Sequence, residues 1–489
     1  MTAGGNGTLP VTNPRTGEID YRVKAWSADE IAGATSSLRD EARAWEALGV
    51  DGRCAALEAW GEALAARRGE LGEALTIDTG RRTFAHFEVQ KAIDLISHWS
   101  RRAPALAAEA RGGQSAQVPS VHYRHRLVPY PVVGIISPWN VPLILALIDA
   151  VPALAAGCTV LLKPSEVTPR FTVPLVEALT EVPALARVLR VVTGGPATGA
   201  AVIDQADAVC FTGSVATGRL VAAHAAQRFI PAFLELGGKD PAIVTATADL
   251  DNAARAIVRS AIGMTGQACQ SLERVYVQAA VYPAFREKVV AEAERVQLNW
   301  PDIDSGQIGP LIFPPQAEKI QAQLDDAVAR GARILCGGRI ERHGGGRWCL
   351  PTVLENVSDE MQLMREETFG PLIPLVPFNS SDEAVRRAND SNFGLSAAVF
   401  AGTEDEAIAI AEQLEVGAVS INDASLTGIV NDVEKNSFRL SGLGGSRMGD
   451  SGFRRFLRKR ALLIQTAEAA PITLFSEGQV PAQEPGSGP

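Results

Sequence analysis

Short apolar segments that alternate with helix-like segments run through the sequence and restrict the fold that it can adopt. Segments with helical spacing separate five β-like segments, at 121–138, 159–164, 186–194, 208–214 and 231–238. Short apolar strands that alternate with helices are typical of a parallel sheet with helices on both faces. The sequence therefore predicts a doubly wound α/β domain in this region.

A similar alternation follows and predicts a second α/β domain. Strand-like segments such as RVYVQ (274–278) and GAVSIN (417–422) are separated by helix-like segments such as YPAFREKVVAEAERV (282–296). Residues 27–79 repeat apolar side chains at three- and four-residue spacing, which predicts helices ahead of the first strand. The Pro- and Gly-rich segment 476–489 is predicted to be a flexible tail.

Composition and charge argue against several classes of protein. The net charge of −10 does not suit a nucleic-acid binder, and the basic run at 454–460 is short enough to be a solvated helix face. The six cysteines have neither C-x-x-C nor zinc spacing, so we expect no disulfide framework, no metal and a cytoplasmic location. The N-terminus does not resemble a signal peptide, and Asp149 interrupts the longest apolar stretch, so no membrane span is expected.

One strand end is a candidate for binding a phosphate group. In CFTGSVATGRLV (210–221), Gly213 and Ser214 stand between an apolar strand and a helix whose first N–H groups could hold a pyrophosphate. Gly218 would let that helix pack close to the strand. The segment departs from the G-x-G-x-x-G pattern, so a plain strand-to-helix turn remains an alternative.

A second strand end carries charged side chains where ligands lie in doubly wound sheets. Lys163 and Glu166 in LLKPSE (161–166) follow a buried strand. A carboxylate there can accept hydrogen bonds from both hydroxyls of a ribose and would repel a 2′-phosphate. A surface ion pair would explain the two residues equally well. Taken together, the two strand ends favour dinucleotide binding.

Three residues are candidates for chemistry. Cys269 lies in GMTGQACQS (263–271), whose small residues leave room for a substrate, although a buried filler thiol is the alternative. Glu235 at a strand end is either a general base with a pKa raised by apolar neighbours or a local cap. Asn140 is either an oxyanion donor, together with the Cys269 backbone N–H, or a helix cap. No motif points a histidine at Cys269, which disfavours a Cys–His hydrolase.

Seven motifs then occur in a fixed order, with Glu235 and Cys269 34 positions apart: PWNVPL, LLKPSE, FTGSVATG, LELGGKDPAIV, GQACQS, EETFGP and SNFGLSAAVF. Together they resemble the NAD(P)-dependent aldehyde dehydrogenase superfamily from about residue 10 to 470. Members that pass the acyl group to coenzyme A typically lack the glutamate, so the resemblance is to the hydrolytic, non-acylating type.

The resemblance implies a fold and an assembly. A doubly wound dinucleotide-binding domain would span 1–119 and 131–237, and an α/β catalytic domain would span 238–440. A small β oligomerisation arm would come from 120–130 and 457–470, and the chain would form a homodimer or a homotetramer.

The resemblance also implies roles for individual residues. Cys269 would attack the aldehyde, Asn140 would stabilise the oxyanion, and Glu235 would activate the water that hydrolyses the thioester to the carboxylic acid. The cofactor would be NAD, with NADP possible and with Glu166 favouring NAD. The residues expected around that cofactor are Trp139, Lys163, Glu166, Gly213, Ser214, Gly218, Leu236, Gly237, Glu367 and Phe369.

Two departures from the family bear on the substrate. Asp149 stands where many members have a lysine, and NSFRLSGLGGSRMG (436–449) replaces the usual C-terminal motif. The side chains expected to line the substrate funnel are apolar and predict an aromatic or medium-chain aliphatic aldehyde: Val141, Leu145, Ile148 and Phe438. A semialdehyde dehydrogenase is the alternative, with Arg274 or Arg439 as candidates for binding its carboxylate. An alternative from another functional class is a protein with the same fold that binds a ligand without catalysis.

Overall fold

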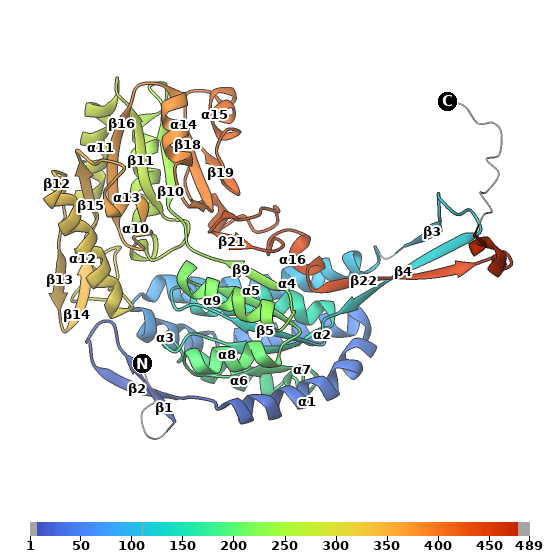
Figure 1. The fold of residues 1–489 in the computed structure, drawn as a ribbon. Coiled ribbons are helices and arrows are strands. Elements are labelled where there is room, and N and C mark those ends of the chain that lie inside the picture. Colours follow the sequence, from blue (N-terminus) through green and yellow to red (C-terminus); the bar gives the residue numbers. More distant parts are fainter. Residues whose placement is uncertain (1–6, 110, 478–489) are drawn as a thin grey trace, which may run out of the picture.

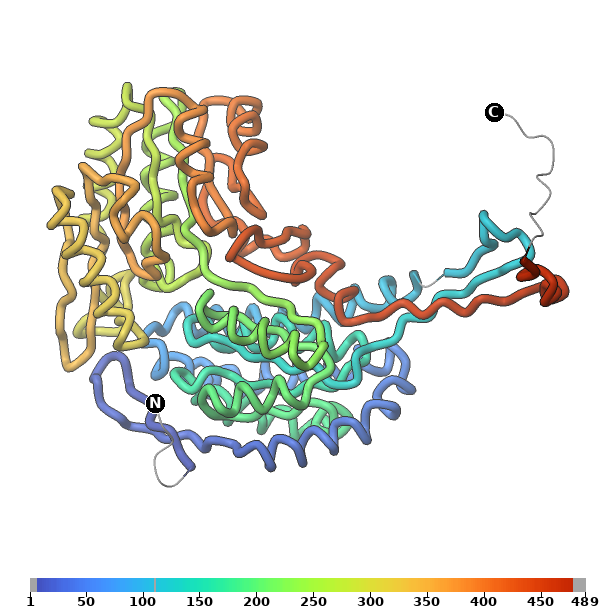
Figure 2. Tube along the Cα trace, viewed as in Figure 1, coloured from blue at the N-terminus to red at the C-terminus, as the bar shows by residue number. Residues whose placement is uncertain are grey.

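The computed structural model describes residues 7–109 and 111–477, so the part of the predicted tail from 478 to 489 lies outside the described residues. Two units, each built on a central sheet, pack against each other, and a thin arm of strands projects away from them (Figure 1). The tube in Figure 2 shows that the last strand of the chain returns along this arm beside a strand from the first third of the sequence.

A hairpin and four helices precede the first sheet: β1 (Thr8–Thr12), β2 (Ile19–Lys24), α1 (Ala28–Ala47), α2 (Gly49–Ala66), α3 (Arg68–Thr79) and α4 (Arg82–Ala107). Helix α1 begins at a capping box, in which the side chains of Ser27 and Glu30 each accept a hydrogen bond from the backbone N–H of the other. The helices predicted within 27–79 are therefore present. Helix α4 extends the helical region well beyond them.

The first sheet has six strands in the order β21-β9-β8-β5-β6-β7. Its parallel strands are β5 (Val132–Ile136), β6 (Thr159–Lys163), β7 (Leu189–Val191), β8 (Ala208–Thr212) and β9 (Ala232–Glu235), with the antiparallel β21 (Gly442–Leu443) at one edge. The helices that connect them are α5 (Pro142–Ala156), α6 (Thr172–Thr180), α7 (Pro183–Ala186), α8 (Pro196–Gln205) and α9 (Val215–Gln227). The predicted strand at 186–194 is shorter than expected because a helical turn that begins at Pro183 precedes it.

Helices cover both faces of this sheet. Val133 and Ile135 of β5 pack into a core with helices α2, α4 and α5. Val132, on the opposite face, packs against side chains of α1 and α8. Because successive side chains of a strand point to opposite faces, a strand buried on both faces is apolar throughout, as this one is. The doubly wound prediction is confirmed.

The second sheet has seven strands in the order β12-β15-β16-β11-β10-β18-β19, parallel except for the β12–β15 pair. These strands are β10 (Asp240–Val244), β11 (Leu272–Gln278), β12 (Arg333–Cys336), β15 (Thr352–Glu355), β16 (Leu372–Phe378), β18 (Ser396–Phe400) and β19 (Ala418–Ile421). The helices around it are α10 (Leu250–Ile262), α11 (Tyr282–Glu294), α12 (Pro314–Ala329), α13 (Gln362–Arg365), α14 (Ser381–Asn389) and α15 (Glu404–Ala411).

Several short elements complete the structure. Two small antiparallel pairs flank the second sheet: β13 (Ile340–His343) with β14 (Gly346–Cys349), and β17 (Phe393–Gly394) with β20 (Phe438–Arg439). The remaining helical turns are η1 (Gly263–Gly266), η2 (Leu426–Gly428), α16 (Ser451–Arg454) and η3 (Ile472–Phe475). None of these was predicted, because each is too short to show a periodic pattern.

The projecting arm is a three-stranded antiparallel sheet in the order β22-β4-β3. It consists of β22 (Leu457–Gln465), β4 (Val121–Pro129) and β3 (Gly112–Gln114). The pairing runs without a register shift from Leu457 opposite Pro129 to Gln465 opposite Val121. The strands predicted for an arm are thus paired with each other, and β3 adds a strand that was not predicted.

Three general features follow from the side chains and helices. All six cysteines are free thiols. Within residues 7–109 and 111–477, no group of three or more His, Cys, Asp or Glu side chains is arranged to hold a metal ion. No helix in the described part of the chain combines the length and the apolar character that a membrane span requires.

Candidate active site

A cavity of about 560 Å³ lies between the two sheet units. Side chains that follow β5, β6, β8 and β9 line one side, at the carboxyl ends of parallel strands, where ligands lie in such sheets. Thirteen of the predicted site residues line this cavity: Trp139, Asn140, Leu145, Lys163, Glu166, Gly213, Ser214, Glu235, Leu236, Gly237, Cys269, Glu367 and Phe369. Val141, Ile148, Gly218 and Phe438 do not line it.

The loop that carries Cys269 is held in an unusual backbone conformation. Met264 and Thr265 have φ values of 52° and 60°, in the left-handed region that side chains rarely adopt. The Thr265 hydroxyl donates to the Gly309 carbonyl at 3.0 Å, and the Gln267 side chain accepts from the Ile312 N–H at 2.9 Å. These bonds to another segment hold the strained turn that precedes the thiol.

The surroundings of Cys269 keep its thiol protonated. Burial raises the pKa of this thiol to about 12, and the nearby carboxylates of Asp240, Glu367 and Glu235 raise it further, whereas the charge of Lys435 lowers it. Only the thiolate is an effective nucleophile. If Cys269 is to act as a nucleophile, a base close to it is needed to take its proton.

Asn140 lies at the entry to α5 and is tied to the Cys269 loop. Its amide Nδ2 donates to the Gln267 carbonyl at 2.9 Å, which uses one of its two amide protons. The Asn140 carbonyl accepts from Arg81 Nη2 at 2.9 Å. Helix α5 has no side-chain cap of its own, and Glu88 of α4 accepts instead from the N–H groups of Leu143 and Ile144 at 2.7 and 3.0 Å. Hydrogen bonds thus hold both the side chain and the backbone of Asn140.

Glu235 ends β9 and is held by a residue that was not predicted. The Ser437 hydroxyl donates to Glu235 Oε2 at 2.8 Å. Glu235 also pairs with Gly442 of β21, so the segment after residue 436 is fixed along the edge of the first sheet. Two residues that lie 202 positions apart meet here, and no local sequence pattern indicates such a contact.

The other end of the cavity suits a dinucleotide. Ser214 is the N-cap of α9 and accepts from the Thr217 N–H at 3.3 Å, and the helix N-terminus faces the cavity. Lys163 Nζ donates to Glu166 Oε2 at 3.3 Å, at the end of β6. A Cβ on Gly218 would lie 2.6 Å from the Leu236 side chain, so glycine is needed for α9 to pack closely, as predicted.

Aromatic rings and a buried ion pair shape the space between these two ends. Trp139 lies edge-on to Phe369, with ring centroids 5.4 Å apart. Phe369 has a φ of 54°, and its N–H donates to Glu273 Oε1 at 2.7 Å. Glu273 also forms a buried ion pair with Lys239 at 2.6 Å. This pair is part of what holds the segment with Phe369 against the cavity.

Glu367 lies in the same segment, beside Gly237. A Cβ on Gly237 would clash with the Glu367 carboxylate, so glycine is required at this position. The Gly238 N–H donates to Glu367 Oε1 at 3.1 Å. Burial, followed by the charge of Glu273, raises the pKa of Glu367 to about 7. The carboxyl lines the cavity, so it is available to form hydrogen bonds with a ligand there.

Asp149, which was noted as a departure, forms a buried ion cluster. It accepts from Arg447 Nη2 at 3.2 Å and from Arg455 Nη2. Arg447 also donates to the Thr212 hydroxyl at the end of β8. The two guanidinium groups outnumber the single carboxylate, so the cluster carries net positive charge. The charge of Arg447 interacts with Glu235 and Cys269 as well as with Asp149. A cationic group thus remains behind the site, although the expected lysine is absent.

Residues 1–462 match the sequence model of the aldehyde dehydrogenase family. The chain belongs to the aldehyde dehydrogenase family. It is therefore an enzyme of the NAD(P)-dependent aldehyde dehydrogenase type, and the family expected from the ordered motifs is confirmed.

Individual aldehyde dehydrogenases are similar over most of the chain. A provisionally assigned NADP-dependent succinate-semialdehyde dehydrogenase from Mycolicibacterium smegmatis is 37% identical over 419 residues, 85% of this chain and 80% of the relative. The provisionally assigned aldehyde dehydrogenase PutA from Anabaena variabilis has a solved structure with 49% identity and a TM-score of 0.93, covering 95% of this chain and 99% of that chain. The structure of betaine aldehyde dehydrogenase from Staphylococcus aureus in complex with NAD⁺ has 27% identity and a TM-score of 0.88. The match covers 98% of this chain and 95% of that chain.

These aldehyde dehydrogenases confirm the predicted fold class and the use of a nicotinamide cofactor. They do not support the prediction of a hydrophobic aldehyde. The substrates in the names of the relatives described above carry charge: succinate semialdehyde is an anion and betaine aldehyde a cation. The semialdehyde alternative agrees better with these names.

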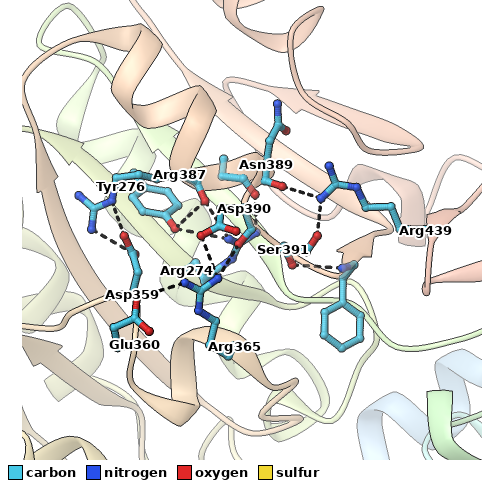
Figure 3. A network of polar contacts seen from close by, with 12 residues as sticks. Arg274, Tyr276, Asp359, Glu360, Arg365, Arg387, Asn389, Asp390, Ser391 and Arg439 are labelled. Carbon is cyan, nitrogen blue, oxygen red and sulfur yellow. Dashed lines mark hydrogen bonds and ion pairs between the residues drawn. The ribbon is translucent and has the colours of Figure 1, made fainter.

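The two arginines considered for a substrate carboxylate serve the aldehyde dehydrogenase fold instead (Figure 3). Arg274 is buried and donates to the backbone carbonyls of Lys239, Arg387 and Ala388. Arg439 donates to the carbonyl of Asn389 at 2.5 Å and to the carboxylate of Glu415, and it does not line the cavity. The guanidinium groups of both are therefore engaged within the protein.

Proposed function

We propose that the protein oxidises a carboxylate-bearing aldehyde, a semialdehyde, to the corresponding dicarboxylic acid with NAD. The convergence of the Cys269 thiol, the Asn140 amide and the Glu235 carboxylate on one cavity carries the catalytic part of this proposal. The M. smegmatis relative, named for succinate semialdehyde, supports the substrate class.

Attack on the aldehyde needs a base and an anion-binding group. The Cys269 sulfur bonds to the carbonyl carbon while its proton passes to a base, and Glu235 in the same cavity is the candidate for that base. The charge that develops on the aldehyde oxygen is stabilised by the Asn140 side-chain N–H and the Cys269 backbone N–H, two donors that are in place before the reaction.

The residues at the other end of the cavity fit NAD. Ser214 and the start of α9 would hold the pyrophosphate, Lys163 and Glu166 the adenosine ribose, and Glu367 the nicotinamide ribose. When bound, NAD supplies the acceptor for the hydride that leaves the substrate carbon. Gly213 and Gly237 line the cavity, and Gly218 lets α9 pack closely against Leu236 beside it.

Hydrolysis of the resulting thioester falls to Glu235. Its Oε2 is held by the Ser437 hydroxyl, so the carboxylate has a fixed position at the end of β9. It takes a proton from a water molecule, the water oxygen bonds to the thioester carbon, and the carbon–sulfur bond breaks. The carboxylic acid is released and the Cys269 thiol is restored.

The units of the fold are assigned to these tasks as follows. The unit with the six-stranded sheet, within 1–119 and 131–237, holds the cofactor, and the unit within 238–440 supplies Cys269. The arm joins copies of the chain into a dimer or tetramer. Strand β21 lies outside these ranges and β3 lies outside the predicted arm, and each extends a neighbouring sheet.

The test is a substrate panel followed at 340 nm with succinate semialdehyde, hexanal, benzaldehyde and betaine aldehyde. We expect the highest kcat/KM with succinate semialdehyde, by about tenfold or more, because a charged pair at a binding site is worth about 1.5–3 kcal/mol. The Cys269→Ala variant should bind NAD in a fluorescence titration but produce no NADH. A preference for hexanal or benzaldehyde would contradict the proposed substrate class.

A further inference from the structure

We propose that Arg81 is a positioning residue for the oxyanion donors, because it fixes Asn140 and the loop that carries Cys269 relative to each other. This inference rests on the proposed function, in which the Asn140 amide and the Cys269 backbone N–H stabilise the charge that develops on the aldehyde oxygen. It concerns a residue that no sequence motif indicated and that does not itself line the cavity.

The guanidinium group of Arg81 binds the backbone on one side of the oxyanion site. Arg81 immediately precedes α4, and its Nη2 donates to the Asn140 carbonyl at 2.9 Å. This bond fixes the peptide plane that follows Asn140. The Asn140 side chain is bound separately, because it donates to the Gln267 carbonyl. Without Arg81, the side-chain bond alone would have to orient the amide.

The aliphatic part of Arg81 packs against the segment that holds the thiol loop. A Cβ on Gly309 would lie 2.5 Å from the Arg81 Cγ, so the side chain lies directly over this glycine. The Gly309 carbonyl accepts from the Thr265 hydroxyl at 3.0 Å, and the Pro310 carbonyl accepts from Gln267 Nε2 at 3.3 Å. Thr265 and Gln267 belong to the loop that precedes the thiol. Arg81 therefore contacts the supports of both oxyanion donors.

The residue before Arg81 is fitted to the same segment. Gly80 has a φ of 68°, and a Cβ on it would lie 2.3 Å from the Pro310 Cγ. Its carbonyl accepts from Asn299 Nδ2 at 2.7 Å. A side chain at this position would meet both the left-handed backbone conformation and the proline ring, so glycine is required. The backbone that carries Arg81 thus has a fixed position against residues 309 and 310.

Arg81 is costly for the stability of the fold. It is buried, and its Nε and Nη1 make no hydrogen bond with any residue that the structure describes. Burial lowers the pKa of Arg81 to about 10, although the charge of Glu88 raises it. Buried donors without partners lower the free energy of unfolding. A cation that is retained despite this cost is better explained by a role in the reaction than by a role in folding.

Three reactions of the same thiol test this assignment in the intact enzyme. Oxidation of an aldehyde with NAD and hydrolysis of p-nitrophenyl acetate both place negative charge on a carbonyl oxygen, so both need the oxyanion donors. Alkylation by iodoacetamide forms a carbon–sulfur bond and releases iodide without charging a carbonyl oxygen. The rates are followed by NADH formation, by nitrophenolate release and by mass spectrometry of the Cys269 peptide.

We expect Arg81→Met to lower kcat for the oxidation and for the ester hydrolysis by about 10- to 100-fold, because displaced donors stabilise the oxyanion poorly. The rate of alkylation should not change. Arg81→Lys, which can still donate to the Asn140 carbonyl, should restore most of the loss. The matched control is Arg53→Met. Arg53 is also buried, and its Nε donates to the Ala155 carbonyl at 3.0 Å, at the other end of α5, so this variant should keep all three rates.

The Asn140→Ala variant separates this inference from the proposed function. If Asn140→Ala slows the oxidation and the ester hydrolysis but Arg81→Met does not, or if Arg81→Met slows all three reactions equally, the inference is overturned and the proposed function stands. If Asn140→Ala slows neither, the proposed oxyanion role fails and the role of Arg81 fails with it. A preference for hexanal over succinate semialdehyde would contradict only the substrate class, because the ester assay does not depend on the aldehyde.

Discussion

At the scale of single residues, the groups that would react are held by residues distant in the sequence. Gln267 accepts from Asn140 across 127 positions, and Ser437 donates to Glu235 across 202 positions. The candidate reactive side chains could be chosen because each stands in a short motif, and all three line one cavity. Their partners could not, because nothing in the local sequence around Ser437 encodes which strand end it meets.

We predict that the preference between NAD and NADP depends on the Glu166 side chain. Glu166 lies at the end of β6 and accepts from Lys163, where it would repel a phosphate on the adenosine ribose. We expect Glu166→Gln to raise kcat/KM with NADP relative to NAD by about tenfold, which corresponds to removing about 1.4 kcal/mol of repulsion. Initial rates at 340 nm with each cofactor measure the ratio.

The control for this change is Glu287→Gln, which alters an exposed carboxylate on α11 and should leave the cofactor ratio as it is. An unchanged ratio in Glu166→Gln would mean that Glu166 does not contact the ribose.

At the scale of elements, α5 shows how one helix depends on another. Its N-terminus lacks a side-chain cap, and the Glu88 carboxylate of α4 supplies one. Burial raises the pKa of Glu88 to about 7, even though the two backbone N–H groups and Arg81 lower it. The sequence predicts α5 from its apolar residues, but the buried acid that caps it comes from a different helix.

Replacing Glu88 tests this cap. The pKa of Glu88 in the folded state is raised above its ordinary value of 4.5. The protonated acid therefore makes its full contribution to the free energy of unfolding at pH values below 4.5. It is lost as the pH rises to about 7. We expect Glu88→Gln, which keeps an acceptor oxygen, to remove on the order of 3 kcal/mol of pH dependence in the free energy of unfolding. Urea unfolding at pH 5 and pH 7.5 gives the two values.

The Glu88→Ala variant separates the effect of capping α5 from the effect of titrating the acid. It removes the acceptor for two N–H groups and should lower the free energy of unfolding by about 1–3 kcal/mol at pH 5. Equal stability of Glu88→Ala and wild type at that pH would show that the cap contributes nothing.

The strands and helices of the two sheets were predictable to different degrees. A helical segment was expected between the strand-like segments at 186–194 and 208–214, and α8 (Pro196–Gln205) lies there. Strand β21 (Gly442–Leu443) was not predictable, since two residues carry no alternation and the strand forms only where the edge of β9 receives it. Long periodic elements follow from local sequence, whereas short edge strands depend on the tertiary structure.

At the scale of the whole molecule, the arm leaves apolar side chains in solvent. Leu462, Leu463 and Ile464 of β22 are 48%, 72% and 42% exposed, and Phe475 of η3 is 83% exposed. We predict that copies of the chain associate through this exposed apolar surface. The arm itself was expected from the family resemblance, but the residues on its surface could be identified only from the structure.

A charge on this surface should weaken assembly. We expect Leu463→Glu to shift the mass measured by light scattering after size exclusion towards that of the 51.7 kDa chain, because a buried unpaired carboxylate opposes association. Val328→Glu, at a half-exposed apolar position on α12, is the control and should keep the wild-type mass. An unchanged mass in Leu463→Glu would place the association surface elsewhere.

The contact between Ser437 and Glu235 also bears on how the enzyme is made. A nascent chain that has reached residue 430 already contains Asn140, Glu235 and Cys269. It still lacks the serine that holds the glutamate, strand β21 at the edge of the first sheet and strand β22 of the arm. The last eighth of the chain thus supplies both the serine that holds Glu235 and one strand of the arm. On the proposed mechanism, a ribosome-bound chain would not hold its base in place until that final segment has emerged.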